Sequence, residues 1–417
     1  MRAIHLKTAH LIDPLGIDIR HPLLTWTCGG GVKQTAYQIT ASVDGAEVWD
    51  TGKVESGGMQ AVYAGLAESR ARVHWQISLW DENGVQGEKS EAWFEYALLE
   101  KTDFRAKWIN PETVPFDAKK YQPASVLVRE FELESVERAR IYATAYGMYV
   151  LYLNGQRFTE NVLTPGTSEY WFRLPYQTFD VSDHLHPGKN RIEVVLGNGW
   201  WQGSNGNTGT RNVFGTDIAL LLQLEVNKEV RLITDDTWRA TQDGPIRFND
   251  LQLGERVDAR RNGNAIHRVE IKNFGYDNLV CANTVPIREM KRFAVKLIRT
   301  SSGKTVLDFG QNMAGYVTFN LNAKAGQTIR MTHGEYIGAN GEFSDSNLQT
   351  RGRQGEPLHQ VVKYICKDGL NEYTPTLCIF GFQYVLVETR RCTVCGRFCR
   401  IPCARQWGSR DREPLSG

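Results

Sequence analysis

The residue types best suited to binding chemistry are concentrated in the stretch Gly197–Gly203, which places Trp200 and Trp201 side by side among three glycines. The stretch follows an apolar run, Ile192–Leu196, that is typical of a buried strand. Inside a strand the two indoles would point to opposite faces and the glycines would weaken the ladder, so we predict a loop at a strand end. Such a loop offers flat aromatic faces for the C–H groups of a sugar and amides for its hydroxyls.

The predicted substrate-binding residues are Asn198, Trp200, Trp201, Asn205 and Tyr170. Stacking on an indole would bury an apolar ring face, and each asparagine amide offers a donor and an acceptor to neighbouring hydroxyls. The alternative is that one or both indoles cap the core of a β-sandwich. A monosaccharide has few heavy atoms and many hydroxyls to desolvate, so we expect a dissociation constant on the order of 0.1 to 10 mM.

Acidic metal ligands are scarce around this stretch. Calcium would assist by coordinating sugar and amide oxygens, but only Glu169 and Asp217 are acidic residues near it in sequence. The metal ligands are therefore unknown and no cofactor is predicted, with calcium left as an open alternative.

The carboxylates do not form a recognisable catalytic pattern. Hydrolysis of a glycosidic bond needs two carboxyl groups across a cleft, one of them with a raised pKa. The densest acidic stretch, Leu253–Arg260, is explained by surface ion pairing, and His333 beside Glu335 is explained by a pair on one strand. The chain also lacks a Gly-x-Ser-x-Gly elbow, a His-Glu-x-x-His motif and a phosphate-binding glycine loop that opens a helix. No catalytic residue is predicted.

The charge balance argues against two classes of partner. Lys and Arg number 49 and Asp and Glu number 47, a formal net charge of +2 that gives no broad attraction for nucleic acid or an anionic membrane. A small neutral ligand fits better. The N-terminal residues lack the apolar core of a signal peptide, no stretch approaches a membrane span, and scattered cysteines suit reduced thiols, so a cytoplasmic location is expected.

The elements that must position these residues are strands. The chain has 11 Trp, 16 Tyr, 17 Phe and 39 Gly, which favours sheets joined by tight turns over helical bundles. Period-two patterning recurs throughout, and helical periodicity over a full helix length is absent. We predict an all-β chain of consecutive β-sandwiches: a fibronectin-like unit at residues 1–103, a second unit at 104–289 and a third at 290–389.

Several conspicuous residues are assigned structural roles. Trp75, Ile77 and Leu79 share one face of a strand at period two, so a core position is favoured over a sugar platform. Asn154 and Gly155 form the dipeptide that suits the type I′ turn of a hairpin. A sugar or ion contact by Asn154 is the alternative.

Two segments interrupt the strand pattern. The polar stretch Ile337–Gly355 is long for a connection and is predicted to be either a lid or a disordered loop. The tail Arg390–Gly417 contains arginine but no lysine, has no strand alternation, and carries four cysteines spaced C-x2-C-x3-C-x3-C. This spacing fits no zinc or iron–sulfur pattern that we can support, so we favour an unstructured tail from an altered reading frame over a metal site.

Short motifs are distributed from about residue 10 to about residue 388. They are Asp13–Asp18, Gln34–Ile39, Trp49–Val54, Lys107–Ile109, Tyr152–Gly155, Leu163–Gly166, Gly197–Trp201, Gly254–Glu255, Asp258–Arg260, Asp308–Gly315 and Phe380–Val385. Each motif is weak alone, but their order resembles that of bacterial α-L-rhamnosidases, and the joint specificity is high.

The resemblance implies a fibronectin-like domain, a jelly-roll domain that in some relatives binds rhamnose with calcium, and a further β-sandwich. In the family these precede an (α/α)6 barrel whose catalytic acid and base act by inversion. That barrel has no counterpart in this chain, so no catalytic residue is transferred. The resemblance implies a truncated rhamnosidase-family protein that binds a rhamnose-containing glycoside or is inactive. The alternative is a structural scaffold for a catalytic barrel, with no ligand of its own.

Overall fold

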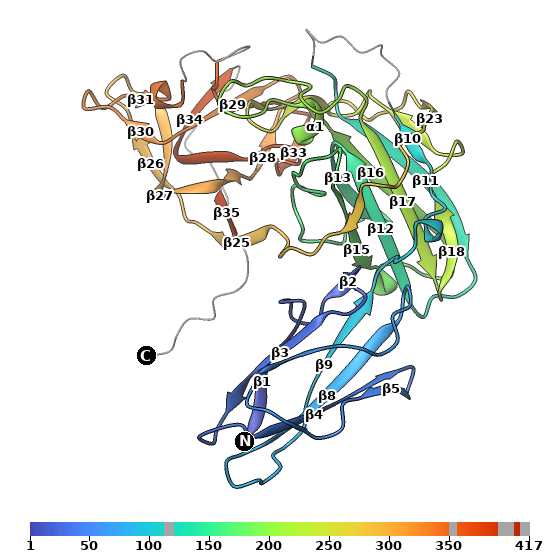
Figure 1. The fold of residues 1–417 in the computed structure, drawn as a ribbon. Helices are drawn as coiled ribbons and strands as arrows, with labels where there is room; N and C mark the ends of the chain where they lie inside the picture. Colours follow the sequence, from blue (N-terminus) through green and yellow to red (C-terminus); the bar gives the residue numbers. More distant parts are fainter. Residues whose placement is uncertain (112–120, 350–356, 391–403, 409–417) are drawn as a thin grey trace.

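The computed structural model describes residues 1–111, 121–349, 357–390 and 404–408 of the chain. Three β units follow one another, with the first (blue in Figure 1) at one end of the molecule and the third (orange and red) beside the second (green). The only α-helix in the described ranges, α1 (Gly199–Gln202), has four residues. The predicted all-β fold of successive sandwiches is confirmed.

The first unit consists of a three-stranded and a six-stranded sheet. Its strands are β1 (Arg2–Thr8), β2 (Leu15–Ile17), β3 (Leu23–Gly29), β4 (Ala36–Val43), β5 (Ala46–Asp50), β6 (Val54–Glu55), β7 (Gln60–Val62), β8 (Arg72–Trp80) and β9 (Ser90–Tyr96). The sheet orders are β1-β3-β7 and β2-β9-β8-β4-β5, with β6 paired to β4. Trp75, Ile77 and Leu79 of β8 are fully buried in the shared core, which confirms their predicted role.

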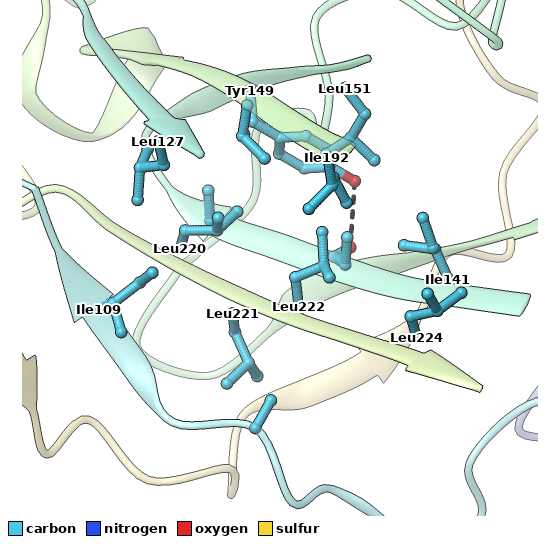
Figure 2. Close-up of a cluster of buried hydrophobic side chains, with 14 of the residues drawn as sticks. Ile109, Leu127, Ile141, Tyr149, Leu151, Ile192, Leu220, Leu221, Leu222 and Leu224 are labelled. Atoms are coloured by element: carbon cyan, nitrogen blue, oxygen red, sulfur yellow. Dashed lines mark hydrogen bonds between the residues drawn. The ribbon is translucent and has the colours of Figure 1, made fainter. Parts of the chain in front are cut away.

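The second unit is built from a seven-stranded and a six-stranded sheet. Its strands are β10 (Trp108–Asn110), β11 (Ser125–Leu133), β12 (Ala139–Tyr146), β13 (Met148–Leu153), β14 (Gln156–Arg157), β15 (Leu174–Asp180), β16 (Gly188–Gly197), β17 (Ala219–Val226), β18 (Glu229–Ile233), β19 (Arg239–Thr241), β22 (His267–Arg268), β23 (Glu270–Lys272) and β24 (Leu279–Cys281). The orders are β23-β10-β17-β12-β15-β24, with β18 on β17, and β14-β13-β16-β11-β19-β22. Leu151 and Ile192 of one sheet and Ile141 and Leu222 of the other belong to one buried core (Figure 2).

The hairpin between β13 and β14 turns at Asn154 and Gly155, whose φ angles are 51° and 79°. Both angles lie in the left-handed region that a type I′ turn requires, so the predicted turn is confirmed. The Asn154 amide donates to Asn190 Oδ1 at 3.0 Å, and its Oδ1 accepts from the Arg191 N–H at 2.9 Å. The side chain of Asn154 therefore ties the hairpin turn to the neighbouring strand β16.

The third unit is dominated by a nine-stranded sheet. Its elements are β20 (Ile246–Asp250), β21 (Gly254–Asp258), β25 (Arg288–Arg292), β26 (Lys296–Arg299), β27 (Thr305–Val317), β28 (Phe319–Ala323), β29 (Thr328–Gly334), β30 (Tyr336–Ile337), β31 (Phe343–Ser344), β32 (Val361–Ile365), β33 (Gly369–Tyr373), β34 (Phe380–Arg390) and β35 (Ala404–Gly408). The order is β20-β21-β32-β29-β34-β27-β35-β25, with β26 on β27, while β28-β33 and β30-β31 are separate pairs. Strands β20 and β21 thus cross the boundary that the sequence places near residue 290.

Strand β27 is long because an irregular register between Asp308 and Met313 lets it continue along β34 from Thr305 to Val317. The stretch Ile337–Gly355 is not a structureless loop over its described part. It contains the β30–β31 hairpin and a 3₁₀ turn, η3 (Ser346–Leu348); residues 350–356 lie outside the described ranges.

The C-terminal tail is partly paired. Ala404–Gly408 forms β35, whose backbone pairs with β25 and β27, so the expectation of an unstructured tail is wrong for this segment. Strands β25 and β27 offer backbone N–H and C=O groups for pairing. These groups explain why Ala404–Gly408 forms a strand although its sequence lacks apolar alternation. The four tail cysteines lie outside the described ranges, and the absence of a metal there stays a prediction.

The junction between the first and second units is centred on the fully buried carboxylate of Glu95 on β9. Arg140 Nε donates to its Oε1 at 2.7 Å, Arg138 Nη2 lies at 2.8 Å from the same oxygen, and Arg72 Nε donates to Oε2 at 3.0 Å. Burial raises the pKa of Glu95, but the hydrogen bonds and charges of Arg140 and Arg138 outweigh it and hold the pKa below its ordinary value. Glu95 is therefore an ionised tie between units, supported nearby by Arg70, which donates to Glu225.

The junction between the second and third units is mainly apolar. One cluster joins Met148 and Val195 of the second unit to Leu377 of the third. Beside it, Glu255 of β21 is fully buried and accepts hydrogen bonds from the Tyr373 hydroxyl at 2.7 Å and from the backbone N–H groups of Thr376 and Leu377. Burial raises the pKa of Glu255 despite these donors, since no cation is among its partners.

Replacing Glu95 with Gln should destabilise the chain by about 3 to 5 kcal/mol, because it leaves buried guanidinium charge without its partner. The folded-state pKa of Glu95 is depressed, so its contribution is present above its unfolded value of about 4.3 and is lost as pH falls through the folded value. Urea denaturation at neutral and acidic pH measures both effects.

Glu91→Gln is the matched control, because Glu91 lies on the same strand with an exposed side chain. The control should unfold like wild type. Equal unfolding free energies for the two variants at neutral pH would rule out the ionic tie.

Candidate functional site

The stretch Gly197–Gly203 forms a helical turn at the end of β16 instead of the predicted loop. The N–H of Gln202 donates to Asn198 O at 3.1 Å, and the N–H of Gly203 donates to Gly199 O at 3.1 Å. These bonds satisfy backbone N–H and C=O groups that would otherwise lack hydrogen-bond partners at the buried end of β16. Gly199 begins the turn with a φ of 53°, and an added Cβ there would crowd the backbone of Gly147.

Trp201 is 6% exposed and lies between the core of the second unit and the surface. Its indole Nε1 donates to Asp217 O at 3.0 Å, and its ring packs at centroid distances of 4.3 Å from Tyr146 and 5.4 Å from Tyr170. Tyr170 is completely buried, and its hydroxyl donates to Gly166 O. Burial raises the pKa of the Tyr170 hydroxyl. Tyr170 supports the indole from inside the protein.

The other predicted site residues are used mainly to hold the turn. Asn198 is buried; its N–H donates to Asn249 Oδ1 at 2.8 Å and its Nδ2 to Asn249 O at 2.9 Å, which ties the turn to β20 of the third unit. Trp200 is half-buried between two apolar clusters. Asn205 Nδ2 donates to Trp200 O at 2.7 Å. These contacts give Asn198, Trp200 and Asn205 structural roles, and none of the three lines the cavity beside Trp201.

A surface cavity of about 690 Å³ opens at the edge of the Trp201 ring. Trp171 and Phe172, which are 58% and 80% exposed, stand at its rim, and Phe214 and Phe274 line it. Phe214 connects the rim to the interior, with ring centroids 5.2 Å from Trp171 and 4.8 Å from Tyr170. The cavity thus presents aromatic rings at several angles to solvent, which suits the apolar face of a sugar ring.

Polar groups from two loops complete the cavity. Asp217 lies 3.5 Å from Lys272 Nζ, and Asp277 pairs with Lys101. The hydrogen bond from Lys101, aided by its charge, lowers the pKa of Asp277. Asn278 Nδ2 donates to the Tyr146 hydroxyl at 2.8 Å. Carboxylate and amide groups at the margin of an aromatic cavity are suited to binding hydroxyls.

Three domain families match successive parts of the chain. Residues 3–100 match the Rha78A-like N-terminal immunoglobulin domain, residues 134–300 the alpha-L-rhamnosidase N-terminal domain, and residues 298–399 the bacterial alpha-L-rhamnosidase concanavalin-like domain. The chain belongs to the bacterial α-L-rhamnosidase family. The resemblance inferred from the dispersed motifs is confirmed.

Individual rhamnosidases match over part of their length. An α-L-rhamnosidase of Alteromonas sp. (strain LOR) is 29% identical over 90% of this chain and 44% of its own length. One from Streptomyces avermitilis is 35% identical over 63% of this chain and 27% of its own length. The chain thus spans less than half the length of these relatives, and their catalytic activity does not transfer directly to it.

Solved rhamnosidase structures share the fold. The α-L-rhamnosidase of Aspergillus terreus superposes with a TM-score of 0.88 at 27% identity, covering 98% of this chain and 49% of that one. A Streptomyces avermitilis α-L-rhamnosidase complexed with L-rhamnose gives a TM-score of 0.86 at 23% identity, covering 98% and 57% of the two chains. The arrangement of the three β units is therefore that of the rhamnosidase N-terminal region.

Of the residues predicted from the sequence, Trp201 lines the cavity and Tyr170 packs beneath it, while the exposed rim residues were not among those predicted. The available signal was the aromatic run Tyr170–Phe172, of which only the first residue was selected. Phe214 and Phe274 are isolated aromatics in the sequence and carry no comparable signal. Their proximity depends on loops that meet only in the folded unit.

The described residues hold no group of three or more His, Cys, Asp or Glu side chains arranged for a metal ion. Asp217, which the sequence places near a candidate calcium site, is instead paired with Lys272, while Glu169 does not line the cavity. In the described part of the chain no helix has the length and apolar character needed to cross a membrane.

Gly215→Ala should displace the Trp201 ring, because an added Cβ would overlap the six-membered ring of the indole. Overpacking of this kind costs about 1 to 3 kcal/mol and should shift tryptophan fluorescence as the indole moves toward solvent. Gly244→Ala is the control, since its Cβ would make an ordinary contact 3.4 Å from Val126. Identical denaturation curves and spectra for both variants would contradict the tight seat of Trp201.

Proposed function

We propose that this chain binds a rhamnose-containing glycoside in the cavity beside Trp201, as the recognition part of an α-L-rhamnosidase. The observation that carries the proposal is the joining of exposed aromatic rings to amide and carboxylate groups in one cavity of about 690 Å³. Rhamnose has a methyl group and C–H faces suited to the rings, and hydroxyls suited to Asn278 and Asp217. The relatives named α-L-rhamnosidases support this ligand class.

Binding is a better fit than bond cleavage for these residues. A glycosidase acid needs a raised pKa, whereas the pKa of Asp277 is lowered by Lys101, and Asp217 lies beside Lys272. The remaining side chains of the cavity are aromatic rings, the Thr216 hydroxyl and the Asn278 amide. The described residues also contain no helical barrel of the kind that carries catalysis in the family.

A cytoplasmic location is also part of the proposal. Cys281, Cys366 and Cys378 are buried free thiols and Cys28 is a half-buried one, a state that fits a reducing compartment. Cell fractionation followed by immunodetection tests this, and recovery of the chain in a secreted or periplasmic fraction would reverse it.

Trp171→Ala should weaken rhamnose binding by about five- to tenfold, because loss of an aromatic stacking face costs on the order of 1 kcal/mol. The wild-type dissociation constant should lie between about 0.1 and 10 mM. Titration by ligand-observed NMR measures both, with and without calcium.

Ile266→Ala is the matched control, since Ile266 and Trp171 are both 58% exposed and Ile266 lies outside the cavity. Its affinity should equal that of wild type. If neither wild type nor control binds rhamnose, or if Trp171→Ala binds as tightly as both, the scaffold alternative is preferred.

The 417-residue chain should give no turnover of an aryl α-L-rhamnoside above background, because the two carboxyl groups of the cavity, Asp217 and Asp277, each lie beside a lysine. A complete α-L-rhamnosidase assayed in parallel provides the positive control. Turnover that disappears in an Asp217→Asn, Asp277→Asn double variant would restore an enzymatic function for the cavity.

A further inference from the structure

A row of cations crosses the outer face of the third unit. Arg256 of β21 is the register partner of Lys363 of β32, which in turn is the partner of Arg330 of β29. The row ends at Glu388 of β34, the register partner of Arg330. Adjacent strands are separated by about 4.8 Å, so three like charges occupy directly neighbouring positions. Residues distant in sequence are thereby gathered into one positive strip.

Stability of the sheet does not explain this strip. Like charges directly opposite each other on paired strands are unfavourable. Protection of a free edge is not the reason either, since β21, β32 and β29 all lie inside the sheet order. The core needs only the opposite face, where Val257, Val362 and Met331 are buried. The like charges on the outer face therefore lower the stability of the sheet, and an anionic ligand would offset this loss.

The strip lines a groove of about 290 Å³, which we call the cationic groove. The guanidinium carbon of Arg256 lies 4.4 Å from the centroid of the Phe248 ring. Arg330 Nε lies 3.7 Å from Glu388 Oε2, and both side chains are 48% exposed. Lys363 is exposed and makes no ion pair with any residue that the structure describes. His359 stands at the margin, paired with Asp345 at 2.8 Å. Glu388 pairs with Arg330, and within the described residues Lys363 has no paired carboxylate.

We propose that the cationic groove binds an anionic group, carboxylate or sulfate, carried by a sugar of an acidic glycan. Arginine forks match planar or tetrahedral oxyanions, while lysine supplies a point charge between them. The volume suits one sugar residue better than an extended macromolecular surface. That the anion is carried by a glycan rests on the proposed carbohydrate-binding function; the positive strip itself does not.

Nucleic acid is the less favoured polyanion. Single-stranded nucleic acid is usually held by exposed aromatic faces together with cations. Here Arg256 covers the Phe248 ring, and the centroid of the Tyr121 ring lies 4.5 Å from that of Phe248. Phe248 is only 6% exposed. The net charge of +2 also provides no broad field around the groove.

A Lys363→Gln, Arg330→Gln double variant tests the proposal in the full chain. Wild type should bind polygalacturonate, dextran sulfate or both, and the variant should lose about tenfold or more in affinity, as expected when charge-assisted contacts are removed. Binding should weaken with added salt. The polygalacturonate and dextran sulfate arms distinguish carboxylate from sulfate. Both polymers lack rhamnose, so the result is independent of the Trp201 cavity and of its own test.

The matched control is Lys189→Gln, Arg268→Gln, which removes the same charge from exposed positions of the second unit. This control should bind both polymers like wild type, and neutral dextran should bind none of the proteins. Circular dichroism melting of the double variant verifies folding, and Lys363→Gln alone serves if the double variant is unstable. No binding by wild type, equal losses in both double variants, or tighter binding of poly(U) RNA than of either glycan would overturn the proposal.

Discussion

A buried carboxylate must be satisfied near each junction of this molecule, and the two junctions solve the problem in opposite ways. Glu95 remains charged because guanidinium groups such as Arg140 surround it, and its pKa is lowered. Glu255 is surrounded by neutral donors, including Tyr373 and Leu377, and burial raises its pKa. The first arrangement depends on charge pairing and the second on hydrogen bonds within an apolar contact. The contacts of Glu95 restrict how the first two units can move, because separation would leave buried charges unpaired, whereas Glu255 and its hydrogen-bond donors all belong to the third unit and order its side of the second junction.

The fixed second junction has a direct consequence for the cavity. Asn198 hydrogen-bonds to Asn249 of the third unit, and Gly197 approaches Leu377 so closely that a Cβ would overlap its side chain. The turn that carries Trp201 is therefore clamped from outside its own sandwich. Pre-positioning of this kind reduces the ordering cost of ligand binding. It also explains why the stretch Gly197–Gly203 has a role in packing. Trp201 is anchored, whereas the exposed rings at the rim of the cavity remain available for contact with a ligand.

Local patterns in the sequence predicted local structure well. Alternation located most strands, and Asn154 with Gly155 located a hairpin whose dihedral angles match the expected turn. Sequence order failed where pairing was long-range: β20 and β21 join the third sheet because β21 pairs in parallel with β32, more than one hundred residues later. The lining of the cavity was predictable only in part for the same reason. Trp201 belongs to a distinctive motif, whereas Phe214 and Phe274 become neighbours only through tertiary structure.

The charges on the surface show the same limit of sequence-based prediction, because the net charge does not reveal which charged residues strand pairing brings together. A balance of +2 describes the far field of the protein, which screening reduces within about 10 Å at moderate ionic strength. It does not describe a row set by strand register, in which residues 256, 330 and 363 become neighbours through one parallel and one antiparallel pairing. A one-residue slip of β32 would turn Lys363 toward the core and bring Val362 or Tyr364 to the surface. The buried face therefore fixes the register, and the register in turn fixes the charges outside it. Because the core already determines this alignment, it places no requirement on the charge of the residues on the outer face, and the positive strip is not needed for the fold.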